Sequence, residues 1–152
     1  MARKSKKALI VTALLVIALA GGMFGYLNKD EENVDEIRDD TLKPSPVTTN
    51  HGTALPSDFP ESFPLYPSSQ ITSSYSTESS KKLGMSVNWE TSASSSDVIK
   101  YFSTELRNKN WSVDVTTDSP NIINFSQDKM KGFIIVADED NIVSITVALS
   151  LQ

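Results

Sequence analysis

The amino-acid sequence predicts an α+β protein: an N-terminal transmembrane helix, then a two-layer domain in which one helix packs on an antiparallel sheet. Two observations carry this prediction. An uncharged apolar run, Ala8–Leu27, is long enough to cross a membrane. Later segments alternate apolar and polar residues, which is typical of half-buried strands, around a single amphipathic helical stretch. The expected element order after the membrane helix is ββαββββ.

The apolar run and its flanks set the expected topology. A helix of this length rises about 30 Å, which matches the hydrocarbon core of a bilayer. Residues 1–7 form a basic tail with Arg3, Lys4, Lys6 and Lys7, and acidic residues follow the run. Because basic flanks stay cytoplasmic, we expect a single-pass protein of the cell membrane. Its N-terminus would be cytoplasmic, and its C-terminal domain would be extracytoplasmic.

A cleaved signal peptide is the alternative for the same run. The basic start, the apolar centre and Ala18-Leu19-Ala20 before Gly21 are the parts of such a signal. Cleavage there would release a secreted domain. The apolar run continues to Leu27, which is longer than a signal peptide needs. The sequence therefore favours a signal anchor, formed by residues 8–27, that is retained rather than cleaved.

The predicted membrane helix has a face of small residues. Ala18, Gly21, Gly22 and Gly25 lie on it, with Gly21 and Gly25 at G-x-x-x-G spacing. Such a face lets two helices approach closely, so it is a candidate surface for a weak homodimer. The alternative is the ordinary use of glycine and alanine near the ends of membrane helices.

Residues 28–54 are predicted to be a disordered acidic linker. Seven acidic residues crowd positions 30–40, and Pro44-Ser45-Pro46 follows them. The few apolar residues cannot bury enough surface to offset the entropy of ordering. A calcium or cationic-partner site is the alternative, but such a charge run more often forms a solvated spacer.

Residues 55–152 carry the predicted extracytoplasmic α+β domain. Its opening, Leu55 to Pro67, contains four prolines and is expected to run extended, in a polyproline path against the domain. Ser94 to Asp97 form a capping box before a helix that should end near Asn108 or Asn110. The strands are predicted over residues 71–77, 83–91, 112–117, 122–126, 133–137 and 142–149.

The opening L-P-x-D-F-P-x-x-F-P-L-Y-P resembles the start of small exported or membrane-anchored bacterial domains of unknown function. The V-I-x-Y-F-x-x-E-L helix after a Ser/Asp-rich cap is similar as well. In those domains a Gly-Trp turn usually follows the helix, whereas this chain has Asn110-Trp111. The resemblance covers roughly residues 55–152. It implies export and a small α+β domain, and it brings no activity or site residues.

Composition narrows the chemistry. The absence of cysteine removes disulfides, thiol catalysis and thiolate metal sites. After position 28, nineteen acidic residues face ten basic ones, which argues against a nucleic-acid partner. His51 is the one histidine, and no G-x-S-x-G elbow occurs. We therefore expect no catalytic residues and no cofactor.

Metal binding is the other chemistry to weigh. Asp138, Glu139, Asp140 and Asn141 could supply oxygen ligands to Ca²⁺, but four polar residues between apolar strands are more typical of a hairpin turn. No metal site is therefore expected.

Two classes of function remain: a non-catalytic binding or sensing module of the bacterial cell envelope, and an envelope hydrolase with an unrecognised site. The missing catalytic motifs favour the first, with an envelope protein or a glycan as partner. Phe59, Phe63, Tyr66 and Trp111 are the aromatic residues outside a regular strand or helix pattern. They are the candidate partner surface. The alternative is that the proline-rich opening seals one edge of the core.

Overall fold

The computed structural model describes residues 45–79, 82–115 and 121–151. Pro44–Gln152 forms one compact unit. Residues 1–44 lie outside the described residues, and with them the predicted membrane helix, its small-residue face and most of the predicted linker. In the part of the chain that the structure describes, no helix is long and apolar enough to cross a membrane.

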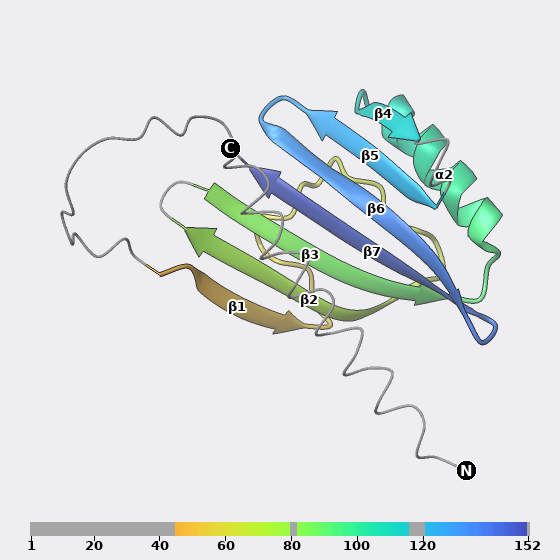
Figure 1. The fold of residues 1–152 in the computed structure, drawn as a ribbon, viewed down its shortest axis with the longest axis horizontal. Helices are drawn as coiled ribbons and strands as arrows, with labels where there is room; N and C mark the ends of the chain where they lie inside the picture. Colours follow the sequence, from red (N-terminus) through yellow and green to blue (C-terminus); the bar gives the residue numbers. More distant parts are fainter. Residues whose placement is uncertain (1–44, 80–81, 116–120, 152) are drawn as a thin grey trace, which may run out of the picture. The chain divides into compact units, whose positions relative to one another are not determined.

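A seven-stranded antiparallel sheet and one helix make up the domain (Figure 1). This confirms the predicted α+β architecture and its ββαββββ core. The sheet order is β1-β2-β3-β7-β6-β5-β4. The elements are β1 (Val47–Gly52), β2 (Gln70–Ser79), β3 (Lys82–Thr91), α2 (Ser95–Asn108), β4 (Ser112–Val115), β5 (Ile122–Gln127), β6 (Met130–Glu139) and β7 (Ile142–Leu151).

Strand β1 lies inside the segment predicted to be linker, so the predicted linker extends too far. It pairs antiparallel with β2 and is mostly exposed, with Val47 at 66 %. The strand gains little from burial, and pairing with the edge of β2 is what orders it. Side-chain bonds support that pairing: Thr48 Oγ1 lies 3.1 Å from Thr77 Oγ1, and His51 Nε2 lies 2.8 Å from Ser76 Oγ.

The proline-rich opening is not an extended polyproline path. It makes two successive turns, in which Phe59 N–H donates to Pro56 O and Phe63 N–H donates to Pro60 O, each at 3.0 Å. The P-x-x-F-P-x-x-F spacing therefore repeats one turn twice. Because a residue before proline avoids the helical region, each turn stops at its phenylalanine. Both rings enter the core.

Helix α2 begins and ends as its sequence predicts. Ser94 is the N-cap, and its hydroxyl accepts from the Asp97 N–H at 3.2 Å. At the other end, Trp111 N–H donates to Leu106 O at 2.9 Å and Asn110 N–H donates to Arg107 O at 3.0 Å. With Asn110 at φ 63°, these bonds form a Schellman motif, which turns the Trp111 side chain back toward the helix.

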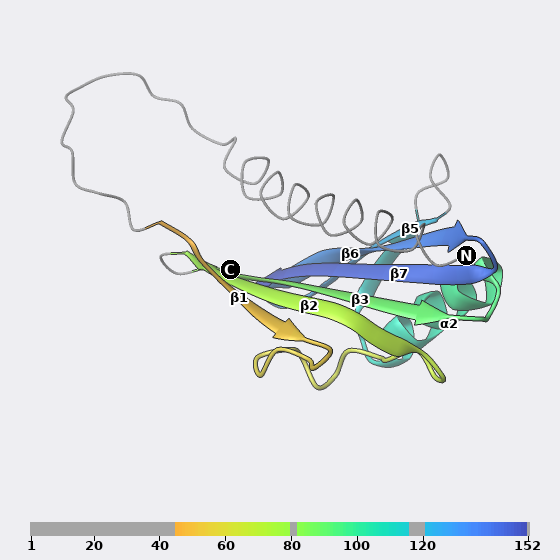
Figure 2. The ribbon, with the colours of Figure 1, turned by 90° about the horizontal axis from the view of Figure 1, so that it is seen from below.

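One face of the sheet is covered by two elements side by side. Figure 2 shows α2 and the segment between β1 and β2 on the same side of the sheet. The helix buries Val98, Phe102 and Leu106, and it contacts β4, β5 and β6. The segment 53–69 brings Phe59 onto Trp89 of β3, with ring centroids 6.3 Å apart. The core is the layer between the sheet and these two elements.

Gly132 is closely packed by its neighbours. It lies between Phe125 of β5 and Leu149 of β7 in the sheet register. A Cβ at this position would come within 2.1 Å of Ala148 O and 2.7 Å of Phe125 Cζ. Glycine leaves room for the Phe125 ring, which fills the space that a side chain would take.

The Schellman motif gives a first prediction. Asn110→Ala should lower the free energy of unfolding by about 1 kcal/mol, because a Cβ without a polar group is strained in the left-handed region. Asn110→Gly should be neutral or stabilising, since glycine adopts this conformation without that strain. Urea denaturation of the three proteins measures the difference. Equal losses for both variants would mean that the asparagine side chain, rather than its backbone conformation, closes the helix.

The position of β1 gives a second. The buried Ser74 hydroxyl donates to Ala54 O, and both β1 and Ala54 precede residue 55. A fragment of residues 55–152 should therefore be less stable than one of residues 45–152, by about 1–3 kcal/mol for the unpartnered hydroxyl alone. Thermal unfolding of the two fragments checks this. Equal melting temperatures would show that β1 contributes nothing to the fold.

Candidate ligand-binding face

The residues predicted to form a partner surface lie in the core instead. Phe59, Phe63 and Trp111 are 8 %, 2 % and 3 % exposed, and Tyr66 is partly buried against the same core. The exposed-surface interpretation is therefore wrong for the first three, and the alternative, that the opening seals the core, describes them. Their irregular spacing comes from turns rather than from exposure.

Phe63 joins these aromatic residues into one cluster. Its ring centroid lies 5.4 Å from Phe59, 6.1 Å from Phe102, 5.8 Å from Trp111 and 5.2 Å from Phe125. Edge-to-face and tilted pairs of this kind add to the energy of burial. The Phe63 ring is therefore the point at which the proline-rich opening contacts α2, the helix C-terminus and β5.

Tyr66 and Tyr101 close the outer side of this cluster. Their ring centroids are 5.0 Å apart, and the Tyr101 hydroxyl donates to Leu65 O at 2.7 Å. Burial raises the pKa of the Tyr101 phenol, and the charge of Glu105 and the Tyr66 hydroxyl raise it further. The phenol thus keeps the proton that it donates to the opening segment.

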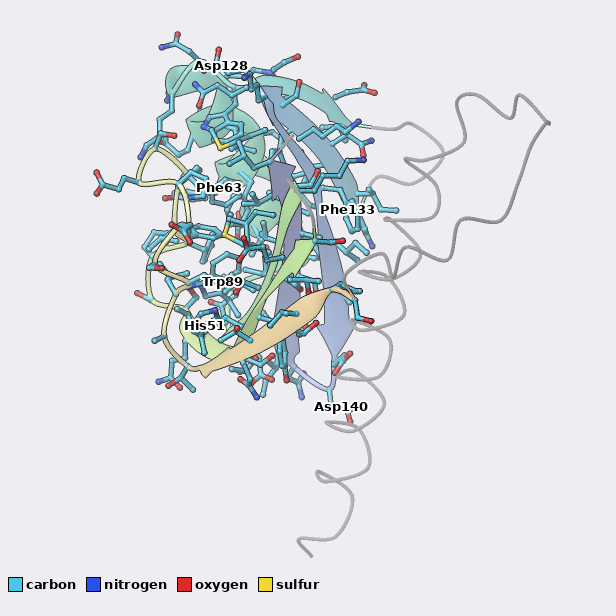
Figure 3. The ribbon with its side chains drawn as sticks, turned by 90° about the vertical axis from the view of Figure 1, so that its left-hand side faces the viewer. His51, Phe63, Trp89, Asp128, Phe133 and Asp140 are labelled. Atoms are coloured by element: carbon cyan, nitrogen blue, oxygen red, sulfur yellow. The ribbon has the colours of Figure 1, made fainter. Side chains whose placement is uncertain are left out.

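The opposite face of the sheet, here called the open face, is different. Among residues 45–79, 82–115 and 121–151, none forms a second layer over it. Figure 3 shows Phe63 and Trp89 pointing toward the opening segment, whereas Phe133 points away from the other side of the sheet. The sheet register assigns the open-face residues of the four middle strands. They are Ser73, Tyr75, Thr77 and Ser79 of β2, Lys82, Gly84, Ser86, Asn88 and Glu90 of β3, Ile142, Ser144, Thr146, Ala148 and Ser150 of β7, and Lys131, Phe133, Ile135, Ala137 and Glu139 of β6.

On the open face, small side chains line β3 and β7 between larger ones on β2 and β6, and this strip of small residues is here called the recess. The outward residues of these two strands are small or of medium size, and Ser86, Asn88, Ala148 and Ser150 are all below 10 % exposed. Tyr75 on β2 and Phe133 on β6 flank the recess in one register row, Tyr75–Ser86–Ala148–Phe133. Three strand spacings separate the two aromatic positions, which makes the recess about 14 Å wide between backbones.

A polar ladder crosses the floor of the recess in the next row. Thr146 Oγ1 donates to Asn88 Oδ1 at 2.7 Å, and Asn88 Nδ2 donates to Ser73 Oγ at 2.9 Å. These two bonds fix the orientation of the Asn88 amide. An amide has two donors and two acceptor lone pairs, so one N–H and one lone pair stay available beyond the ladder.

Ser86 is the unusual residue of the recess. It is 6 % exposed, and its Oγ is buried without a hydrogen-bond partner. An unpartnered buried hydroxyl costs about 1–3 kcal/mol. Since Ser86 lies two residues from Asn88 on the same strand, both point to the same side of the sheet. The recess therefore holds a buried hydroxyl without a partner and an amide of fixed orientation on the same side of the sheet.

A serine and a histidine lie within hydrogen-bond distance of each other, as in a nucleophile–base pair. His51 Nε2 lies 2.8 Å from Ser76 Oγ at the β1–β2 edge. A nucleophile–base pair also needs a group that orients the base and donors that hold an oxyanion. Within the described residues His51 has no carboxylate partner among its hydrogen bonds, so the pair acts as a link between β1 and β2.

Two other features of the sheet are the β6–β7 turn and a pocket at the strand ends. The residues from Asp138 to Asn141 form the β6–β7 hairpin, with Asp140 and Asn141 both at positive φ, as the turn interpretation predicted. The described residues contain no group of three His, Asp or Glu side chains placed to hold a metal ion. An open pocket of about 290 Å³ at the strand ends is lined by Asp58, Glu78, Lys82, Leu83 and Leu151.

Comparison with known proteins identifies the family. A family model described as START domain-like matches residues 71–148, just over half of the chain. The chain therefore belongs to this START domain-like family. The matched range runs from β2 into β7 and contains α2 and the residues of the recess except Ser150. No curated protein and no solved structure matches the chain.

Family membership favours a binding role. START-like domains are generally ligand-binding domains, so the family agrees with the expected binding module. The matched range leaves out β1 and the proline-rich opening, and so does not bear on the resemblance drawn from that opening. The recess cannot be predicted from the sequence, because its residues come together only through the pairing of four strands.

Phe63 gives a third prediction. Phe63→Ala should destabilise the domain by about 3–5 kcal/mol, because it removes a buried ring from the centre of the aromatic cluster. Leu65→Ala, two residues away and 45 % exposed, should cost less than about 0.5 kcal/mol. Chemical denaturation measures both. A small effect of Phe63→Ala would show that the opening does not hold α2 against the sheet.

Proposed function

We propose that this protein is a single-pass membrane protein that presents a non-catalytic, ligand-binding module outside the cytoplasm, and that the open face is its binding surface. The START domain-like family supports a binding role. The apolar run Ala8–Leu27 with its basic flank supports the membrane anchor and the N-in orientation.

The observation that carries this proposal is the strip of small residues on the open face between Tyr75 and Phe133. On the covered face, Phe63 and its neighbours pack together between the sheet and the helix. The open face instead combines partly exposed aromatic walls with small, recessed polar residues. Binding sites typically combine aromatic surface with a few placed polar groups.

The cysteine-free sequence allows a direct test in intact cells. Ser57→Cys lies on the exposed part of the opening segment, and Ser144→Cys lies on the open face beside the recess. A maleimide that does not cross membranes should label Ser57→Cys in intact cells, as an extracytoplasmic domain requires. It should label Ser144→Cys much more slowly in cells than in the purified full chain, because a bound ligand covers the face.

Three outcomes would contradict the proposal. Labelling of both variants only after lysis would place the domain in the cytoplasm. Equal labelling of Ser144→Cys in cells and in the purified chain would mean that nothing occupies the open face. Protection of Ser144→Cys already in the purified chain would mean that the protein itself covers the face.

A further inference from the structure

We infer that one end of the sheet docks on the phospholipid bilayer in which the chain is anchored. This end, here called the hairpin end, consists of the starts of β1 and β3, the ends of β2 and β7, and the β5–β6 turn. The inference rests on the proposed function, since it needs the membrane anchor. It goes beyond that function, because contact through the strand ends assigns a second surface and leaves the open face free for a ligand.

An incompletely covered apolar row lies at the hairpin end. Sheet pairing joins the side chains of this row, on the face that α2 and the opening segment cover: Val47, Glu78, Leu83, Leu151 and Met130. Leu83 and Met130 pack partly against the core, whereas Val47 is 66 % and Leu151 40 % exposed. Among the described residues, two of the four large exposed apolar side chains therefore lie in this one row.

The apolar row borders the open pocket of about 290 Å³ at the strand ends. Leu83 and Leu151 give the pocket apolar surface, and Asp58, Glu78 and Lys82 give it charges of both signs. Exposed apolar surface with a polar rim is typical of protein or membrane contacts. The hairpin end therefore has the composition of a docking surface.

The charges at the two ends of the sheet decide which end can approach a bilayer. At the hairpin end Lys129 and Lys131 flank Met130, and lysine side chains can lie along apolar surface while their ammonium groups reach the phosphate layer. Figure 3 shows Asp128 of this end and Asp140 at opposite ends of the sheet. The strand ends and turn at the Asp140 end carry only acidic charges: Glu90, Asp138, Glu139 and Asp140. An anionic lipid surface repels such an end.

The path of the chain favours the bilayer over a soluble partner. Val47 of the apolar row begins the first described strand, and the residues before it lead toward the predicted membrane helix Ala8–Leu27. The hairpin end is therefore the end at which the chain from the anchor enters the domain. Because the tether raises the effective concentration of the domain at the bilayer, a few apolar contacts suffice for docking.

The test is fluorescence quenching of the full chain, reconstituted into nanodiscs of phosphatidylcholine and phosphatidylglycerol. Since the chain has no cysteine, Leu151→Cys and Ile142→Cys each take a single nitrobenzoxadiazole label. The two positions are a matched pair, because they end the same strand and are 40 % and 46 % exposed. Doxyl groups on the lipid acyl chains should quench the label at position 151 and leave the label at position 142 unquenched. Position 151 is far from the anchor along the chain, so its quenching reports docking of the domain.

Val47→Asp tests the apolar row in the labelled Leu151→Cys protein. It should lower the docking equilibrium constant about tenfold or more, the effect expected when the burial of one valine side chain is lost. Thr49→Asp is the matched control. Thr49 is also exposed on β1 and faces the same side of the sheet, but it lies one residue pair further from the hairpin end. The control adds the same charge and should leave the quenching unchanged.

Three results would overturn the inference: no quenching at position 151, equal quenching at positions 151 and 142, or equal effects of Val47→Asp and Thr49→Asp. If the chain enters nanodiscs and the label at position 151 is not quenched, docking fails and the proposed anchor stands. A chain that stays in solution without lipid or detergent would remove the anchor, and the inference with it.

Discussion

The packing of Phe63 against four other rings is the contact on which the rest of the domain depends. The opening segment contributes Phe63 and Phe59, α2 contributes Phe102, the helix C-terminus contributes Trp111, and β5 contributes Phe125. Neither the helix nor the opening segment covers the sheet alone, and each shields the apolar face that the other leaves bare. A helix and a pair of proline-containing turns thus form one layer on the sheet.

Because α2 and the opening segment together cover one face of the sheet, the residues of the open face have no part in that core. All the large buried apolar side chains of β3 and β7 point toward the helix and the opening segment. The alternate residues of these strands therefore do not pack in the core and need not be large or apolar. On the open face, β3 and β7 carry mainly small polar residues, and the flanking strands β2 and β6 carry larger ones. The recess between Tyr75 and Phe133 is a consequence of this order of sizes across four strands.

The elements that could be predicted from the sequence are those whose own residues show a capping motif or a helical or strand periodicity. The Ser94–Asp97 cap, the apolar repeat of α2 and the alternation of β3 and β7 are confirmed. Strand β1 escaped prediction because its polar residues are ordered by pairing with β2 rather than by burial. The core aromatics Phe59 and Phe63 were assigned to a surface because two turns, not a helical or strand period, direct them inward. Family membership came only from comparison with known proteins.

The position of β1 at the edge of the sheet has a mechanical consequence. The residues that precede Val47 join the domain through β1, so any pull transmitted along the chain from that side acts first on this strand. Its hold on β2 consists of backbone pairing, the Thr48–Thr77 bond and the His51–Ser76 bond, with little buried surface. Under load β1 would peel away before the ring cluster is disturbed, lengthening the connection by six residues while the recess on β3 and β7 stays intact. The edge strand would thus serve as an extensible link between the domain and whatever holds its N-terminal side.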